Sequence, residues 1–153
     1  MKGVWGLDQV VQPMVQAMIG LPRPFWNARA LAFVQGDEIH GGLVFHGYEP
    51  ERGIIEVSAA SRSPKWITRT ILGMATKFAY DTCQCHALVA CTTPENRAVD
   101  LWRALGATEV TVPHLMGRDK PEIVFVLTDA AWKSSKFRTR TNGQKGQQRS
   151  AAA

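Results

Sequence analysis

The chain has 153 residues, of which 45% are apolar and 20% are charged. This length and composition favour one domain with its own core and exclude wholesale disorder. The formal net charge is +5, but residues 133–153 hold six Lys and Arg side chains and no acid, which leaves residues 1–132 with a net charge of −1. The basic character therefore belongs to a C-terminal tail and is no evidence that the domain binds nucleic acid.

The three cysteines form no even-numbered disulfide framework, which favours a reduced, cytoplasmic setting. The apolar run before Asp8 is too short for the core of a signal peptide. The uncharged stretch from Gln9 to Pro22 carries three glutamines and two prolines, so we do not expect it to cross a membrane. We therefore expect a soluble cytoplasmic protein.

The first predicted element is a helix, followed by three strands. Apolar residues recur at helical spacing from Val10 to Ile19, with Asp8 as the expected N-cap and Gly20 as the start of the terminating turn. Strands are predicted over 30–34, 39–45 and 54–59, with turns at 35–37 and 49–53. Their short connections indicate an antiparallel meander.

The second half alternates helices and strands. A 3.6-residue period predicts an amphipathic helix over 66–82, and a short buried strand follows over 87–91. Thr93 and Pro94 are the expected N-cap and first residue of the next helix, which ends at Gly106. The last strands are expected over 108–112 and 123–128.

These elements predict an α+β fold with a mixed, mainly antiparallel central sheet flanked by helices. One domain is expected over residues 1–132. Residues 133–153 are rich in Ser, Lys, Arg, Gln, Gly and Ala, and Phe137 is their only large apolar residue, so we expect a disordered basic tail.

The order of elements and several short motifs resemble the GNAT superfamily of N-acetyltransferases. The strongest motif runs from Asn96 to Ala107 and looks like the family's Asn-x-x-Ala-x-x-Leu/Tyr-x-x-x-Gly-Phe segment. Residues 63–69, Ser-Pro-Lys-Trp-Ile-Thr-Arg, resemble the turn that opens the long helix in a subgroup common in phages and proteobacteria. Residues 44–48 and 53–57 are similar to strands of that subgroup. The likeness covers roughly residues 5–132 and implies a bacterial or phage-infected host cell.

The resemblance implies acetyl-CoA as co-substrate. Its pantetheine arm would lie in a V-shaped gap between the strand that ends near Ala59 and the strand that starts near Ala87, bonded to the backbone of Val57, Ser58 and Ala59. Its pyrophosphate would lie at the N-terminus of the 66–82 helix, where unpaired N–H groups and the helix dipole attract anions. The predicted cofactor-binding residues of that turn are Lys65, Trp66, Thr68, Arg69 and Thr70.

Three positions depart from the family pattern. Pro64 and Trp66 stand where most members have glycines; Pro64 has no N–H for a phosphate, and Trp66 would either crowd the phosphates or cover the adenine. Trp102 stands where many members have a tyrosine that protonates the leaving thiolate, and an indole cannot act as that acid. Asn96 either binds the pantetheine arm or caps its own helix.

Glu56 is the best candidate for a catalytic base, because it is an acid in an otherwise apolar strand. Burial there would disfavour its charged form and make it a stronger base for an ammonium substrate. The other interpretation is a structural carboxylate bonded to a neighbouring strand or to Arg62. His46, on the neighbouring strand, either relays a proton through water or is a structural residue at its strand end.

The remaining candidates have weaker patterns. Cys83, Cys85, His86 and Cys91 lack the spacing of a structural zinc site, so we predict core packing and no metal. Phe25 and Trp26 either line the acceptor pocket or form a hydrophobic plug.

The sequence therefore predicts an N-acetyltransferase that moves an acetyl group from acetyl-CoA to a primary amine of a small molecule or protein, with Glu56 and His46 as catalytic residues. The alternative is a GNAT-fold binding or virion-associated protein with weak or no catalysis. Its basic tail would then tether it to nucleic acid or a larger assembly. The family resemblance is also compatible with a homodimer, and no membrane partner is expected.

Overall fold

The computed structural model describes residues 1–138 and contains one seven-stranded sheet, in the order β1-β2-β3-β4-β5-β7-β6. The strand bounds are Lys2–Val4 (β1), Arg29–Gln35 (β2), Glu38–Glu49 (β3), Ile54–Ser61 (β4), Ala87–Thr92 (β5), Thr108–Val112 (β6) and Glu122–Thr128 (β7). Neighbouring strands are antiparallel except for β4 and β5, which are parallel. This confirms the predicted mixed, mainly antiparallel sheet and the meander of its first half.

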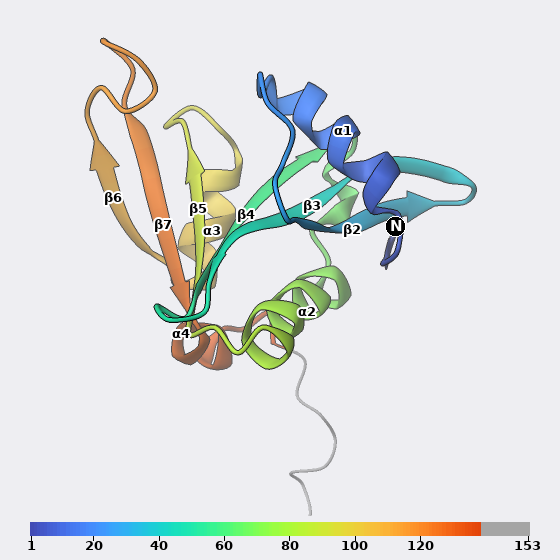
Figure 1. The fold of residues 1–153 in the computed structure, drawn as a ribbon. Coiled ribbons are helices and arrows are strands. Elements are labelled where there is room, and N and C mark those ends of the chain that lie inside the picture. The colour runs from blue at the N-terminus through green and yellow to red at the C-terminus, as the bar shows by residue number, and fades with distance from the viewer. Residues whose placement is uncertain (139–153) are drawn as a thin grey trace, which may run out of the picture.

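In the described part of the chain, four α-helices cover the sheet: α1 (Asp8–Ile19), α2 (Arg69–Lys77), α3 (Ala98–Leu105) and α4 (Asp129–Ser134). A 3₁₀ helix, Pro64–Trp66, precedes α2, and a π-helical segment, Phe78–Thr82, follows it. Helices α1 and α2 lie on opposite faces of the sheet (Figure 1). None of the helices within residues 1–138 combines the length and apolar character that crossing a bilayer requires.

The alternation of apolar side chains along the strands supplies a core to each face. Under α1, Val11 and Val15 pack against Ala30, Ala32 and Val44. The larger cluster lies on the other face, beneath α2, α3 and α4, and its largest fully buried members are Phe33, Phe45, Leu31, Ile71 and Leu127. Strands β2, β3 and β4 are therefore buried on both faces where α1 crosses them.

Two predicted helix starts are wrong. The helix expected over 66–82 begins at Arg69, because Thr68 caps it: the Thr68 Oγ1 accepts from the Ile71 N–H at 3.1 Å. The next helix begins at Ala98 and not at Pro94, with Arg97 in the cap position. Gly106 ends that helix with φ of 86°, as the sequence predicts.

Asp8 is also used differently from the prediction. It is the first residue of α1, Leu7 is the N-cap, and no side chain caps the helix. The Asp8 carboxylate instead accepts a hydrogen bond from the backbone N–H of Ala30 in β2, at 2.8 Å. Asp8, a residue type that often caps helices, thus joins α1 to β2.

Two elements were not predicted. Strand β1 adds three residues at the edge beside β2. Helix α4 runs to Ser134, two residues beyond the expected domain boundary at 132, and Phe137 packs against the main core. The rest of the predicted tail, residues 139–153, lies outside the described residues, so its expected disorder stays a prediction.

The sheet opens between β4 and β5. These strands pair only at Ile54–Ala87, Ile55–Leu88 and Glu56–Val89, whereas β4 continues beside β3 as far as Ser61. From Val57 onward, β4 has β3 on one side and no paired strand on the other. Figure 1 shows the two halves of the sheet diverging at this point, as expected of a splayed strand pair.

Candidate active site

His46, Glu56 and Ser58 form a polar cluster where β4 leaves β5. His46 of β3 and Glu56 of β4 are direct register partners. His46 Nδ1 lies 3.4 Å from Glu56 Oε2, and His46 Nε2 lies 2.9 Å from Ser58 Oγ. Glu56 and Ser58 project from one face because they are two residues apart on a strand. The structure thus brings both predicted catalytic residues together with a hydroxyl.

Burial governs the charge of His46. Loss of solvent lowers the pKa of His46 below its ordinary value of 6.5, although the nearby Glu56 carboxylate opposes the shift. The imidazole is therefore mainly neutral at pH 7 and has one ring nitrogen free to accept a proton.

Glu56 is more exposed than the sequence predicts. Its side chain is 49% exposed, against 21% for His46. The predicted burial of this carboxylate is therefore wrong, because solvent reaches the side chain. Exposure makes it accessible to an incoming ammonium group, and within the described residues its close neighbour is the imidazole of His46 and not Arg62.

A cleft of 440 Å³ lies beside this cluster. Its walls are mostly apolar, with Arg23 and His46 as the polar side chains, and they consist of Leu21, Pro22, Arg23, Pro24, Phe25, Trp26, His46 and Gly47. The Phe25 ring packs over the His46 imidazole with centroids 5.1 Å apart. Trp26 is 87% exposed, so it is no hydrophobic plug. The alternative prediction, that Phe25 and Trp26 line a pocket, agrees with this geometry.

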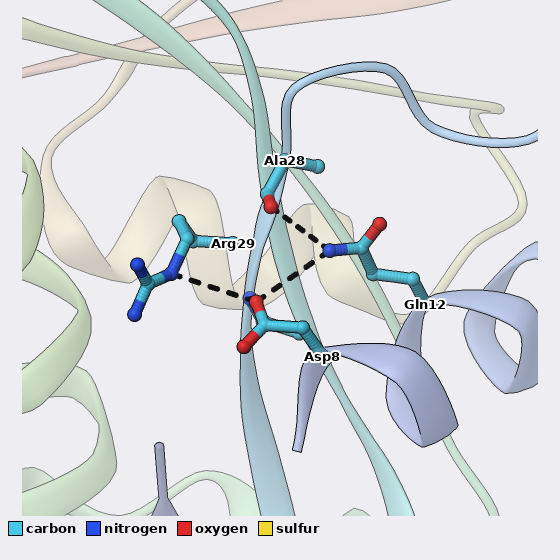
Figure 2. A network of polar contacts seen from close by, with 5 residues as sticks. Asp8, Gln12, Ala28 and Arg29 are labelled. Atoms are coloured by element: carbon cyan, nitrogen blue, oxygen red, sulfur yellow. Dashed lines mark hydrogen bonds and ion pairs between the residues drawn. The ribbon is translucent and has the colours of Figure 1, made fainter. Parts of the chain in front are cut away.

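Glutamines of α1 hold both ends of the segment that forms the cleft. Gln16 Nε2 donates to the carbonyl of Leu21 at 3.2 Å, and Gln12 Nε2 donates to that of Ala28 at 2.9 Å. Asp8 extends the second anchor, with its Oδ1 3.6 Å from the Nε of Arg29. Figure 2 shows Asp8 and Gln12 reaching from α1 to this strand end. The segment is thereby fixed to α1 on both sides.

The free edge of β4 holds the backbone groups predicted to bind the cofactor. Val57, Ser58 and Ala59 lie directly beyond the last β4–β5 pair. Successive backbone groups of a strand point to alternate sides, so part of this stretch has hydrogen-bonding groups directed to the open side. An extended amide-containing arm fits such an edge as an additional strand would.

The turn after β4 supplies positive charge and free N–H groups. Lys65, Arg69 and Thr70 are exposed. Within the described residues, the backbone N–H groups of Arg69 and Thr70 have no protein acceptor, as expected of a first helical turn. This turn fits an anionic group such as a pyrophosphate. Pro64 lies in the preceding 3₁₀ helix, so its missing N–H is not taken from the first turn of α2.

Trp66 contacts the core of the protein, and its predicted contact with the phosphates or the adenine stays a prediction. Its ring stacks on Phe33 with centroids 4.9 Å apart and an interplanar angle of 4°. Trp66 therefore anchors the turn to the main core.

The sequence matches no protein-family model and no curated protein. The structure is similar to a proposed acetyltransferase from T. thermophilus, at 18% identity and a TM-score of 0.60, covering 78% of this chain and 66% of that one. It is also similar to a chimera of the spermidine N-acetyltransferase SpeG from Vibrio cholerae with hSSAT, at 13% identity and a TM-score of 0.65, covering 86% and 98%. A GCN5-related N-acetyltransferase from Brucella melitensis has 16% identity and a TM-score of 0.57, covering 69% and 52%.

The fold is that of the GNAT N-acetyltransferases. At these identities the likeness shows the fold alone, and the chain spans about two thirds of the length of the T. thermophilus protein.

Two residues of the predicted Asn96–Ala107 motif make contacts within the protein. Asn96 Oδ1 accepts from the Ala98 N–H at 2.8 Å in the turn before α3, but Arg97 and not Asn96 occupies the cap position. Trp102 packs on Phe125 with centroids 6.1 Å apart. Together with Trp66, it lines an apolar cavity of only 30 Å³ between α2, α3 and the sheet, about the volume of one water molecule. Trp66 and Trp102 thus fill space between α2, α3 and the sheet.

The cysteines are free thiols. Within residues 1–138, no group of three or more His, Cys, Asp and Glu is placed to hold a metal. Burial, together with the carboxylates of Glu122 and Glu56, raises the pKa of Cys91 to about 11, so this thiol is protonated at pH 7. Glu122 itself has a raised pKa, from burial and the charge of Glu56. Local sequence does not point to Glu122, because only the pairing of β7 within the sheet brings it close to Glu56 and Cys91.

Proposed function

We propose that the protein transfers an acetyl group from acetyl-CoA to a primary amine. The observation that carries this proposal is the opening of the sheet after Glu56, with a basic helical turn at one end and the His46–Glu56 pair beside it. The GNAT fold supports the reaction class by analogy.

Acetyl-CoA would be held along β4 and at the start of α2. The backbone of Val57 to Ala59 would bond the pantetheine arm. Lys65, Arg69 and the free N–H groups of Arg69 and Thr70 would bind the pyrophosphate. Bound in this way, the thioester supplies the acetyl group.

Glu56 would act as the general base. Its exposed carboxylate attracts an ammonium group and takes one proton from it, directly or through water, so that the amine becomes a nucleophile. His46, 3.4 Å away, orients this carboxylate and offers a second proton acceptor.

The acceptor's arm would lie in the cleft beside His46. The lining is apolar, and Arg23 is its only charged side chain among the described residues. A second ammonium group would meet the Arg23 guanidinium, so the cleft suits a monoamine with an apolar or aromatic arm better than a polyamine. SpeG is a spermidine N-acetyltransferase, and spermidine is a polyamine. The acceptor proposed for this chain would therefore differ from that of SpeG.

The first experiment tests the cofactor site. Thermal unfolding is measured with and without millimolar acetyl-CoA, with AMP as the control ligand. A ligand at a hundred times its Kd adds about 2.7 kcal/mol of stability, which corresponds to roughly 5–10 °C for a domain of this size. A shift with acetyl-CoA and none with AMP supports the site, and no shift contradicts it.

The second experiment tests the base. Glu56→Gln should lower kcat/KM for a panel of primary amines by about a hundredfold or more, because general-base catalysis contributes roughly 10²–10⁴. Glu38→Gln is the matched control, since Glu38 is also an exposed acid paired with a histidine, His40, at 3.6 Å. Equal turnover in the two variants would remove Glu56 from the mechanism.

A second candidate function is a GNAT-fold binding or virion-associated protein without efficient turnover. The cavity of 30 Å³ between Trp66 and Trp102 favours it, because a pantetheine arm needs more room on that side. The tail that would tether such a protein lies mostly outside the described residues. Absence of turnover on all amines, together with loss of a partner when residues 139–153 are removed, would support this alternative. The phage and proteobacterial subgroup, the cytoplasmic location and a homodimer remain predictions.

A further inference from the structure

Ser58, His46 and Glu56 stand in the order hydroxyl, imidazole, carboxylate. The Ser58 Oγ is within hydrogen-bonding distance of His46 Nε2, at 2.9 Å, and the opposite ring nitrogen faces Glu56 at 3.4 Å. In the tautomer that carries its proton on Nδ1, His46 donates toward the carboxylate, and Nε2 accepts from the serine hydroxyl. A nucleophile, its base and a group that orients the base therefore lie in sequence.

The imidazole is held in this position by its surroundings. Phe25 packs over the ring, and the side chain is only 21% exposed. Two strands fix the partners, because His46 and Glu56 are register neighbours and Ser58 is the diagonal neighbour of His46.

Ser58 also lies where an acyl group could be bound. It is the second residue beyond the last β4–β5 pair, so backbone N–H groups of the open edge lie around it. Such groups can stabilise negative charge that develops on a carbonyl oxygen. Ser58 does not line the cleft itself, but its hydroxyl contacts His46, which does.

We propose that Ser58 is a catalytic nucleophile that takes an acyl group from an activated ester or thioester. The bond from Ser58 Oγ to the acyl carbon forms, and the bond from that carbon to the leaving oxygen or sulfur breaks. The hydroxyl proton passes to His46 Nε2 and then to the leaving group. Water, or an amine in the cleft, next attacks the acyl-serine; His46 takes the proton and returns it to Ser58 Oγ, which releases acetate or the acylated amine.

The inference relies on the proposed function only for the natural donor, so its test uses a donor that needs no coenzyme site. The full chain is incubated with p-nitrophenyl acetate at neutral pH, and p-nitrophenolate release is followed by absorbance. Peptide mass spectrometry then locates any acetyl group. We expect an acetyl group on Ser58 and a burst of about one p-nitrophenolate per chain if the second step is slower.

Four variants separate a nucleophile from a structural hydroxyl. Ser58→Ala should abolish acetylation at residue 58, and His46→Ala should lower its rate by about a hundredfold or more. Ser58→Cys should keep it, because a thiol replaces the hydroxyl at the same place. Ser61→Ala is the matched control: Ser61 is on the same strand, but its hydroxyl is bonded to the Ser63 backbone.

Acetylation of Ser58 that depends on His46 confirms the proposal, whether or not acetyl-CoA binds. A folded wild-type chain that neither cleaves the ester nor carries an acetyl group on Ser58 overturns it, and so does ester cleavage that is unchanged in Ser58→Ala. Acetyl-CoA-dependent acetylation of amines that is equally fast in Ser58→Ala also overturns it and leaves the proposed function intact.

Discussion

The two sides of the β4–β5 opening differ in how completely they are built. On the α1 side, a neutral histidine lies within 3.4 Å of both an exposed carboxylate and a hydroxyl, beside a cleft of 440 Å³. On the α2 side, Trp66 and Trp102 help to line a cavity of only 30 Å³, and Pro64 precedes the turn that opens α2. Under the proposed function, the acceptor side is pre-organised, whereas the donor side would depend on the free edge of β4 and the charges of its turn. Variants on each side test this contrast.

The largest effect is expected at the donor side. Replacing both Lys65 and Arg69 with alanine should raise the Kd for acetyl-CoA by about a hundredfold, since each charge-assisted contact contributes roughly 1.5 kcal/mol or more. Isothermal titration calorimetry measures the change. Lys77→Ala is the control, because Lys77 is at the other end of α2. A Kd unchanged in the double variant would mean that the phosphates bind elsewhere.

On the acceptor side, the anchor at Asp8 should matter for stability. Asp8→Ala leaves the N–H of the fully buried Ala30 without its acceptor, which costs about 1–3 kcal/mol. Urea unfolding gives this free energy directly. Asp37→Ala, in the exposed turn between β2 and β3, should change it little. A loss equal in the two variants would show that the anchor contributes nothing specific.

Substitutions of Trp26 test whether the cleft prefers amines with an apolar arm. Trp26→Ala should raise KM for phenethylamine about tenfold with little change in kcat, because one exposed aromatic contact contributes about 1–2 kcal/mol. Trp26→Phe should restore most of the binding, and Val10→Ala, on the exposed part of α1, should have no effect. If spermidine is the better substrate and Trp26→Ala leaves both KM values unchanged, the arm binds outside the cleft.

The smallest effect concerns pH and His46. Burial lowers its pKa below 6.5 in the folded chain, so the unfolded chain binds this proton first as the pH falls. Stability from His46 is therefore present above pH 6.5 and is lost as the pH falls from 6.5 through the folded pKa. Melting temperatures of wild type and His46→Gln should converge or cross below pH 6.5. A gap that is constant from pH 5 to pH 8 contradicts this prediction.

Several parts of the fold follow from local sequence. Short apolar runs separated by turns predict the β2–β3–β4 meander. Gly106 ends α3 because its backbone adopts a left-handed conformation. The start of α2 was harder to predict, since Ser63 and Thr68 are both good capping residues and each caps a helix, the first one only a 3₁₀ turn. Local patterns do not decide between two such caps.

The site was only partly predictable. Glu56 and His46 were identified as candidates, but their contact depends on the β3–β4 register, which shifts between His46 and Glu49. A shift of one residue would place them on opposite faces. The sequence predicts only that the backbone of Ser58 binds the cofactor. The proposed role of its hydroxyl rests on its contact with His46, which is visible only in the structure.

The two glutamine anchors on α1 have an evolutionary consequence. Gln12 and Gln16 bond the carbonyls of Ala28 and Leu21, so these anchors place no demand on the side chains of the six residues between Leu21 and Ala28. Apart from Phe25, which packs against His46, these residues can be exchanged by mutation while the helix and the strand stay where they are. Under the proposed function, new acceptor preferences would arise in this segment without redesign of the scaffold.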